Sequence, residues 1–231
     1  MNTIYLVRHG ENPANITKEF SSRKVDYSLN ARGILQARQT GEYFRRMGID
    51  EVYASPLKRA RETGEIIAAT CGLTCTVTEH FREIDVGDLE GQPVTEEAWA
   101  YHDRIFDDWL LGRPETGFPN GDTYFSLWGR IRAGVLQAIH GKSGKKIVIV
   151  GHGGIFTATI QDLCPQVNVV ELAKKFTANC GITTVTVEER DGQPVGKLMR
   201  WDESSHLHGE ASLQVYPKYD KGTFDAASAS D

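Results

Sequence analysis

The sequence has little that would suit it to a membrane, a secretory route or a polyanionic partner. No apolar run approaches the ~20 residues that a membrane-spanning helix needs. No basic stretch followed by a cleavage region marks the N-terminus as a signal peptide. The formal charge of −5 disfavours binding to nucleic acid or to an anionic membrane surface. We therefore expect a cytoplasmic protein whose partners are neither nucleic acids nor membranes.

Cysteine and metal-binding patterns are also scarce. The chain has four cysteines: Cys71, Cys75, Cys164 and Cys180. Their spacing matches neither a disulfide framework nor a zinc ribbon, so we interpret them as free thiols. No rich cluster of carboxylates or of Cys and His is present to hold a metal ion. His206 and His208 would share one face of a strand, but few carboxylates lie near them in the sequence. We predict neither a metal nor another cofactor.

Strand-like and helix-like segments alternate along most of the chain. The patterns of strands occur at 3–7, 51–54, 74–78 and 147–150. The patterns of helices occur at 31–47, 56–69 and 155–163. Asn30 and Gly48 are typical of the two ends of the first helix, and Pro56 suits the first turn of the second. This alternation predicts one α/β domain over residues 1–224, a three-layer sandwich whose mostly parallel central sheet is flanked by helices.

Three segments differ from that alternation. Asp191-Gly192 lies between two strand-like runs and predicts a β-hairpin, whose free edge would suit a homodimer. Residues 92–128 are aromatic, acidic and helical in pattern, and we interpret them as an insertion or lid. Residues 225–231 are small and polar, so we predict a disordered tail.

Charged side chains follow several of the predicted strands. Arg8 and His9 come after the first strand and Arg59 shortly after the second. Glu83 follows the third and His152 the fourth. Because the carboxyl ends of parallel strands meet at one edge of a sheet, we expect these side chains to converge. Arginine offers a planar donor fork for phosphate oxygens, histidine a nucleophile or donor, and glutamate a proton shuttle.

Four sequence blocks contain these residues. They are Arg8-His9-Gly10-Glu11 with Asn15, Ser55 to Thr63, Glu83 to Gly91, and Val150 to Gly154. In this order they resemble the histidine phosphatase superfamily, which includes the phosphoglycerate mutases. The match runs from residue 3 to about residue 207, and Asn179 and His206 also stand where many relatives have similar residues. The chain departs from the pattern at Asn12, where relatives usually have Thr or Ser, and at 119–123.

The resemblance implies catalysis through a phosphohistidine. His9 would be the nucleophile, with a backbone carbonyl holding the proton on its other ring nitrogen. Glu83 would protonate the leaving oxygen and then activate water. Arg8, Arg59 and His152 would stabilise charge on the transferring phosphoryl group. We therefore predict a metal-independent phosphomonoesterase.

Further phosphate contacts are expected from four residues: Asn15, Ser21, Ser22 and Gly153. For the first three, turn-forming roles are an alternative. Arg59 could instead be a surface charge of its helix, and His152 a satisfied core histidine. Glu83 could be a structural ion-pair partner of Arg82 or Arg59.

Three functions stay open. Residues 92–122 hold seven acids against Arg104 and Arg113, and an acidic lid would be a poor cover for a bisphosphate. This favours a phosphatase acting on small phosphate monoesters over a phosphoglycerate mutase. A catalytically inactive binding module is the third hypothesis. The aromatic residues of this segment could form its core, the interpretation we favour, or an apolar pocket for the substrate. His80, His102 and His140 are expected to be structural.

Overall fold

The centre of the protein is a six-stranded sheet. The computed structural model describes residues 1–215, so the predicted tail at 225–231 lies outside the described residues. The strands are β1 (Asn2–Arg8), β2 (Glu51–Ala54), β3 (Cys75–Val77), β4 (Lys146–Gly151), β5 (Ile182–Arg190) and β6 (Gln193–Glu203). Their order is β3-β2-β4-β1-β5-β6, and only β5 runs antiparallel to its neighbours. The mostly parallel sheet predicted from the sequence is confirmed.

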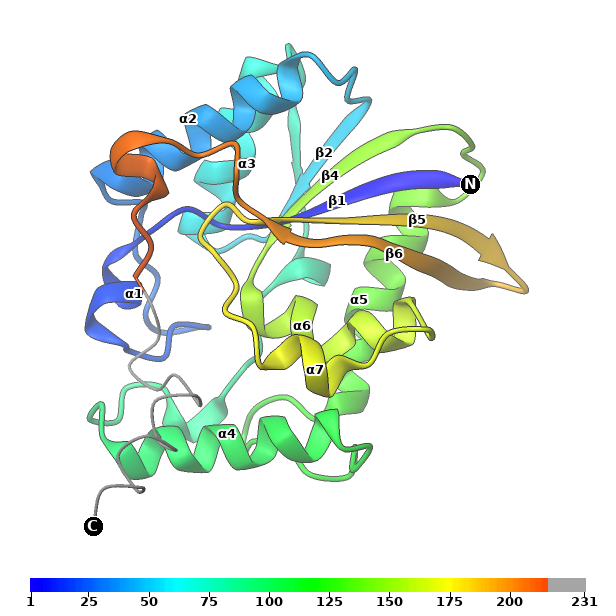
Figure 1. The fold of residues 1–231 in the computed structure, drawn as a ribbon. Helices are drawn as coiled ribbons and strands as arrows, with labels where there is room; N and C mark the ends of the chain where they lie inside the picture. Colours follow the sequence, from blue (N-terminus) through cyan, green and yellow to red (C-terminus); the bar gives the residue numbers. More distant parts are fainter. Residues whose placement is uncertain (216–231) are drawn as a thin grey trace.

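Helices cover both faces of the sheet, which gives three layers (Figure 1). On one face α2 (Ala31–Arg45) and α3 (Lys58–Thr70) pack against Tyr5 and Val7. On the other face α5 (Tyr124–Ile139) and α6 (Gly153–Leu163) pack against Ile4 and Leu6. Successive β1 side chains point to opposite faces, so a continuous apolar strand is buried on both sides. This is why the strands that carry the candidate site read as unbroken hydrophobic runs.

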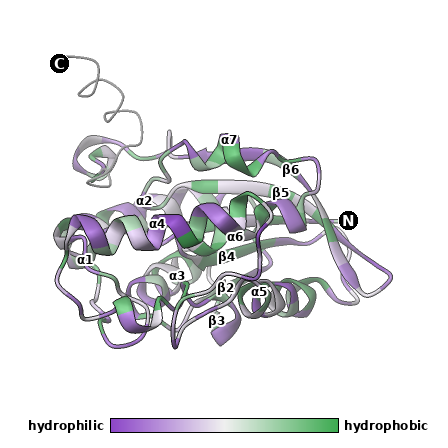
Figure 2. Ribbon diagram, turned by 90° about the horizontal axis from the view of Figure 1, so that it is seen from below, coloured by the Kyte–Doolittle hydropathy of each residue, from purple (hydrophilic) through white to green (hydrophobic). Residues whose placement is uncertain are grey.

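The remaining helices are short, apart from α4 (Glu96–Leu110). They are α1 (Pro13–Thr17), α7 (Val169–Ala173) and three 3₁₀ turns, η1 (Glu79–Phe81), η2 (Gly87–Leu89) and η3 (Gly209–Ser212). Hydrophobic residues gather on the strands and on the helix faces turned toward them, whereas α4 runs across the near side of the molecule with many hydrophilic residues (Figure 2). No helix among residues 1–215 is both long and apolar enough to cross a membrane.

One of the two predicted helix starts in the N-terminal part of the chain is confirmed and the other is wrong. Asn30 caps α2 as predicted, because its side chain accepts a hydrogen bond from Gly33 N. The predicted start of the next helix at Pro56 is wrong, since α3 begins at Lys58 after an extended Leu57. A turn holds the preceding residues: Ser55 N donates to Val150 O, and Ser55 Oγ accepts a hydrogen bond from Leu57 N. The helix therefore starts only after the chain has left β2.

The hairpin between β5 and β6 is confirmed. Asp191 and Gly192 have φ values of 50° and 70°, the left-handed conformation that a tight two-residue hairpin turn requires. β6 forms one edge of the sheet. Dimerisation through this edge stays a prediction.

Segment 92–128 contains two different helices. α4 is capped by Thr95, whose side chain accepts a hydrogen bond from Ala98 N, and it lies apart from the sheet (Figure 1). α5 begins at Tyr124, inside the segment, and continues into the core, where Leu127 and Ile131 are buried. Only the α4 part has the position of a lid.

Candidate active site

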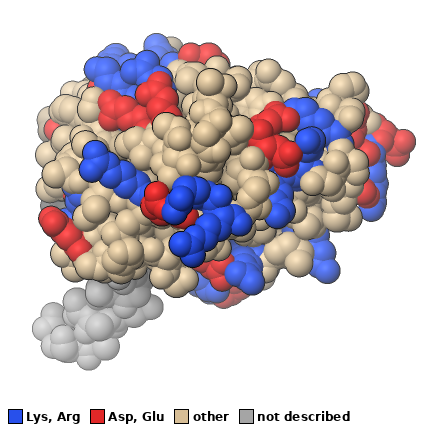
Figure 3. All heavy atoms as spheres, turned by 90° about the horizontal axis from the view of Figure 1, so that it is seen from above, with Lys and Arg blue, Asp and Glu red and all other residues tan. Residues whose placement is uncertain are grey.

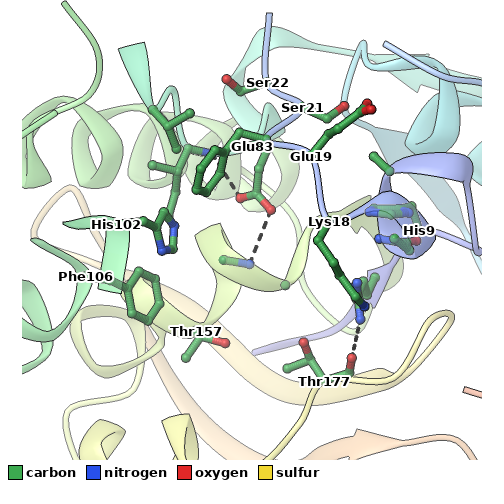
Figure 4. A pocket seen from close by; sticks show the side chains of 18 of the residues that line it. His9, Lys18, Glu19, Ser21, Ser22, Glu83, His102, Phe106, Thr157 and Thr177 are labelled. Atoms are coloured by element: carbon green, nitrogen blue, oxygen red, sulfur yellow. Dashed lines mark hydrogen bonds between the residues drawn. The ribbon is translucent and has the colours of Figure 1, made fainter. Parts of the chain in front are cut away.

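A cavity of about 490 Å³ opens at the carboxyl ends of β1 and β4, and α4 forms its opposite wall. It is lined by four of the residues predicted to converge: Arg8, His9, Arg59 and Glu83. The fifth, His152, is not among the lining residues, but its ring centroid lies 5.2 Å from that of His9. The structure thus brings together side chains from four separate parts of the sequence. Figure 4 shows two of them, His9 and Glu83, at the cavity.

The His9 ring is held in one tautomer. Nδ1 lies 2.7 Å from Gly10 O and therefore carries the proton, while Nε2 accepts a hydrogen bond from Arg59 Nε at 3.1 Å. Burial, reinforced by the charges of Arg59 and Arg8, lowers the pKa of His9 well below its ordinary value. At neutral pH the ring is uncharged, and Nε2 presents a lone pair at the cavity floor.

The backbone around His9 is fixed from several directions. His9 N donates to Gly151 O, and Asn179 Nδ2 donates to His9 O, both at 3.0 Å. Gly10 N donates to Thr63 Oγ1 on α3. A Cβ atom on Gly10 would lie 2.6 Å from the carbonyl oxygen of Gly33, so only glycine permits this approach of the loop to α2.

The two arginines face the cavity without carboxylate partners. Arg59 donates to Ser21 Oγ at 3.0 Å and to Ser21 O at 2.7 Å, and Arg8 donates to Thr177 O. Neither takes part in a salt bridge within residues 1–215. Burial lowers the pKa of Arg59 to about 10, which still leaves it protonated at neutral pH. Arg59 is buried, so the alternative of a surface charge is wrong.

His152 is fully buried, but only one of its two ring nitrogens has a hydrogen-bond partner among residues 1–215. Its Nε2 lies 2.8 Å from Ser55 Oγ, whereas Nδ1 is buried and has no hydrogen-bond partner in the described part of the chain. Burial, together with the charges of Arg59 and His9, lowers the pKa of His152 well below its ordinary value. A satisfied core histidine, the alternative reading of the sequence, would not leave a buried ring nitrogen without a partner.

Glu83 points into the start of α6. One carboxylate oxygen accepts a hydrogen bond from Ile155 N at 2.9 Å, and the other from Gly154 N at 3.3 Å. A helix N-terminus favours such a carboxylate. The expected alternative, an ion pair with Arg82, is wrong, since Arg82 pairs with Glu79 at 2.7 Å. Glu83 therefore stays available at the cavity surface.

Asn15 lines the cavity and also shapes the local chain. Its Oδ1 accepts hydrogen bonds from Asn12 N and Asn179 Nδ2, and Asn12 Oδ1 accepts one from Asn15 N, which closes a capping box at α1. The side chain of Asn12 is buried, and its Nδ2 is unpartnered among residues 1–215. Asn12, a position at which the sequence departs from the family pattern, thus caps the N-terminus of α1.

Ser21 and Ser22 differ in what their hydroxyls contact. Ser21 Oγ accepts a hydrogen bond from Arg59 and donates to Val25 O at 2.6 Å. Ser22 Oγ lies 3.3 Å from a carboxylate oxygen of Glu90. Both residues line the cavity, but Ser22 is buried and its hydroxyl is directed to Glu90.

Glu90 organises the loop that carries these serines, a role that we did not predict. Its carboxylate accepts hydrogen bonds from the backbone of Ser22, Arg23 and Val25 at 2.7 to 3.1 Å. Burial acts to raise the pKa of Glu90, but the backbone donors outweigh it, and the pKa is lowered. The signal was present, because Glu90 belongs to the same sequence block as Glu83.

The wall opposite the phosphate-binding groups is aromatic. Trp99, His102, Asp103 and Phe106 of α4 line the cavity together with Phe20. Trp99 Nε1 donates to Lys18 O at 3.2 Å, which ties α4 to the loop after α1. His102, which we expected to be structural, lines this wall. The aromatic residues of the segment divide into two groups. Some, such as Trp109, are buried in the hydrophobic core, whereas others, such as Phe106, line the cavity.

The number of acidic residues in 92–122 does not predict which charges line the cavity. Of the seven acids only Asp103 lines the cavity. Asp108 pairs with Arg113, and Asp122 with Arg130. The cavity instead has three lysines: Lys18, Lys174 and Lys175. The acidic-lid argument against a mutase is therefore wrong.

Elsewhere the charges are mixed. On the side of the molecule away from α4, acidic and basic side chains are interspersed (Figure 3). No group of three or more His, Cys, Asp or Glu that could hold a metal ion occurs in residues 1–215. His206 instead places Nε2 2.9 Å from Thr40 Oγ1.

The family model of the histidine phosphatase superfamily (branch 1) matches residues 4–199. The chain belongs to this superfamily. Among curated relatives, the "uncharacterized phosphatase PhoE" of Bacillus subtilis is 36% identical over 163 residues, which cover 71% of this chain and 78% of PhoE. The "probable phosphoglycerate mutase GpmB" of Salmonella arizonae is 32% identical over 215 residues, which cover 90% and 96% of the two chains.

Solved structures agree with this placement in the superfamily. A mycobacterial glucosyl-3-phosphoglycerate phosphatase superposes with a TM-score of 0.74 at 22% identity, covering 88% of this chain and all of the other. An Entamoeba histolytica phosphoserine phosphatase in complex with 3-phosphoglyceric acid superposes with a TM-score of 0.70 at 27% identity, covering 90% of this chain and all of the other. The protein is thus a histidine phosphatase superfamily enzyme, a phosphatase or a mutase.

Proposed function

We propose that this superfamily member is a metal-independent phosphatase that hydrolyses small-molecule phosphate monoesters through a phosphohistidine on His9. One observation carries the proposal. The His9 ring keeps its proton on Nδ1 through Gly10 O, and its Nε2 lies at the floor of the cavity, where it accepts a hydrogen bond from Arg59 Nε. Neither Arg59 nor Arg8 forms a salt bridge within residues 1–215. A neutral imidazole in a cationic surrounding suits attack on a dianionic phosphate, because the phosphate is bound while the nucleophile stays unprotonated.

In the first step, His9 Nε2 forms a bond to phosphorus and the ester P–O bond breaks. Glu83, in its protonated form, transfers its proton to the leaving oxygen. Arg8, Arg59 and His152 stabilise the charge on the phosphoryl oxygens. Arg59 Nε, now 3.1 Å from Nε2, would exchange that contact for a phosphoryl oxygen. The buried Nδ1 of His152 would gain a partner in the same way.

In the second step, a water molecule attacks the phosphohistidine and Glu83 accepts its proton. The P–N bond breaks, which regenerates neutral His9 and releases inorganic phosphate. Glu83 is then protonated again and ready for the next turnover. The two half-reactions need no metal and no cofactor, since every proton is carried by His9, Glu83 or water.

The remaining expected phosphate contacts divide into direct and indirect ones. Asn15, Ser21 and the backbone of Gly153 line the cavity beside Arg8 and Arg59, and we propose that they donate to the phosphate. Ser22 acts through the loop, since its hydroxyl and backbone bind Glu90.

The leaving group would lie along α4. A phosphoryl group fills only a small part of a cavity of about 490 Å³, and the far wall includes Phe20, Trp99 and Phe106. An apolar wall of this kind favours an organic leaving group with substantial apolar surface.

A phosphoglycerate mutase is the second candidate. Two observations favour it: the cavity has Lys18, Lys174 and Lys175 in addition to its arginines, and the probable mutase GpmB is 32% identical over most of both chains. Extra cations would suit a multiply charged phosphate ester that stays bound between two transfers.

A phosphate-release screen over many phosphomonoesters, run with the wild type and His9→Ala in parallel, tests the phosphatase. We expect release by the wild type alone, unaffected by a chelator. Incubation with 3-phosphoglycerate and its bisphosphate primer tests the mutase through formation of 2-phosphoglycerate. Isomerisation that outpaces phosphate release from every monoester would overturn the proposal in favour of the mutase.

A further inference from the structure

His102 is a polar group with a defined orientation in the aromatic wall of the cavity. His102 lies on the opposite side of the cavity from His9 (Figure 4). Its ring stacks on Phe20 at 5.3 Å and on Phe106 at 6.0 Å between centroids. Trp99 and Phe118 contact the ring as well. These contacts hold the imidazole in place, since any reorientation would break several ring contacts at once.

The neighbour of His102 decides which ring nitrogen carries the proton. Asp103 Oδ1 lies 3.0 Å from His102 Nδ1. An ionised carboxylate only accepts hydrogen bonds, so the neutral ring must carry its proton on Nδ1. Nε2 is then a hydrogen-bond acceptor.

Nε2 of His102 remains open to the cavity. No hydrogen bond to it occurs within residues 1–215, and it is not among the fully buried, unpartnered side-chain atoms of that range. Both His102 and Asp103 line the cavity, with side chains 17% and 35% exposed. An oriented acceptor set in an apolar wall is the kind of group that selects a ligand by a single hydrogen bond.

We propose that His102 Nε2 accepts a hydrogen bond from a hydroxyl group of the leaving group, so that the preferred substrates are hydroxylated phosphate monoesters. Such a substrate would place its phosphate at His9, its apolar body along Phe106, and the hydroxyl at His102. Asp103 is a positioning residue that acts by fixing the tautomer. The inference rests on the proposed phosphatase function and assigns the substrate class of the same cavity.

The charge of the cavity favours a hydroxyl over an ammonium group as the donor. Among residues 1–215, five cationic residues line the cavity: Arg8, Lys18, Arg59, Lys174, which also pairs with Glu171, and Lys175. In the same range three acids line it: Glu19, Glu83 and Asp103. A substrate that carried its own positive charge would add to this excess, whereas a neutral donor satisfies Nε2 without it.

Pairs of aryl phosphates that differ only in a hydroxyl or a methoxy group at the same ring position test the inference. The methyl ether removes the donor and keeps the oxygen. For at least one ring position we expect the wild type to prefer the hydroxyl compound by about tenfold in kcat/KM, the effect of one specific hydrogen bond. His102→Phe retains a stacked ring and should bring that ratio close to one.

Two further variants separate the effect of the His102 ring orientation from the effect of replacing a histidine ring by a phenyl ring. Asp103→Ala should lower the ratio part of the way, and adding it to His102→Phe should change nothing more, because Asp103 acts through His102. His140→Phe is the matched control: this exposed histidine pairs with Glu189 outside the cavity, and the wild-type ratio should persist. Long-range ¹H–¹⁵N correlation of the His102 ring should show the proton on Nδ1 without any substitution.

The outcomes distinguish the inference from the proposed function. Hydrolysis of the aryl phosphates without a hydroxyl preference at any position, or a preference that persists in His102→Phe, overturns the role of His102 and leaves the phosphatase intact. A proton on Nε2 of His102 would overturn it as well. Absence of phosphate release from every monoester would instead contradict the proposed function itself.

Discussion

The two ends of the cavity are built in different ways. At the phosphate end, His9 and Arg8 sit at the end of β1, and backbone groups such as Gly10 O and Thr177 O hold their side chains. At the leaving-group end, α4 presents rings that contact one another, with the hydrogen bond from Trp99 to Lys18 O as its tie to the phosphate side. The sheet thus positions the phosphate end, whereas ring packing forms the wall at the leaving-group end.

The largest effect should come from the phosphate end. We expect His9→Ala to lower kcat by at least about 10⁴-fold, since no other group in the cavity replaces the nucleophile. Thermal unfolding should remain cooperative, because the sheet does not depend on this side chain. Steady-state hydrolysis of 4-nitrophenyl phosphate and a melting curve check both points. Residual activity within tenfold of the wild type would mean that the phosphoryl group does not pass through His9.

Glu83→Gln should cost less and should depend on the substrate. We expect a loss of about 10²- to 10⁴-fold on alkyl phosphates, which need a proton on the leaving oxygen. The loss on 4-nitrophenyl phosphate should be smaller, because nitrophenolate leaves without one. The two rates measured side by side give the comparison. Equal losses on both substrates would show that Glu83 is not the acid.

At the α4 end, Phe106→Ala should change binding and not chemistry. Loss of this apolar contact should raise KM for naphthyl phosphate about tenfold, with inhibition by inorganic phosphate unchanged. Phe125→Ala is the matched control, since Phe125 is exposed and lies outside the cavity. If Phe106→Ala weakened the binding of inorganic phosphate as much as that of naphthyl phosphate, the two ends of the cavity would not bind their parts of the substrate independently.

The smallest effect concerns stability at the phosphate end. The pKa values of His9 and His152 are lowered in the folded protein, chiefly by burial. Below about pH 6.5 the unfolded chain therefore binds protons that the folded protein does not, and the free energy of unfolding falls as the pH falls.

Replacing either histidine with Gln should reduce that dependence by at most about 1.4 kcal/mol per pH unit. Urea unfolding between pH 6.5 and 5 gives the slope, which is independent of any constant loss of stability caused by the substitution. An unchanged slope in both variants would show that folding does not lower the pKa of either ring.

The same division between the two ends explains what the sequence could predict. β1 and β4 are unbroken apolar runs followed by Arg8, His9 and His152, and strand ends in a parallel sheet converge by topology alone. The convergence of these side chains could therefore be predicted from the sequence, whereas their roles came from the resemblance to the superfamily and stay predictions. The helix start predicted at Pro56 was wrong because Ser55 is held in a turn by a hydrogen bond to β4, and no local sequence pattern shows that contact.

The α4 end could not be predicted in this way. The helical pattern of residues 96–110 does not say which face meets the cavity, so Trp109 in the core and Phe106 in the wall look alike in the sequence. The acid count failed for the same reason: Asp108 pairs with Arg113 and does not line the cavity. His102 became a candidate only when the packing of α4 placed it opposite His9.

Covalent attachment of phosphate to His9 tests the central claim most directly. Rapid acid-free quenching during turnover of a ³²P-labelled monoester should trap a base-stable, acid-labile phosphoprotein, and peptide mapping should place the label on His9. The amount should rise in Glu83→Gln with a good leaving group, if water attack slows more than attack by His9. Turnover without any labelled protein, or a label on another residue, would contradict the account.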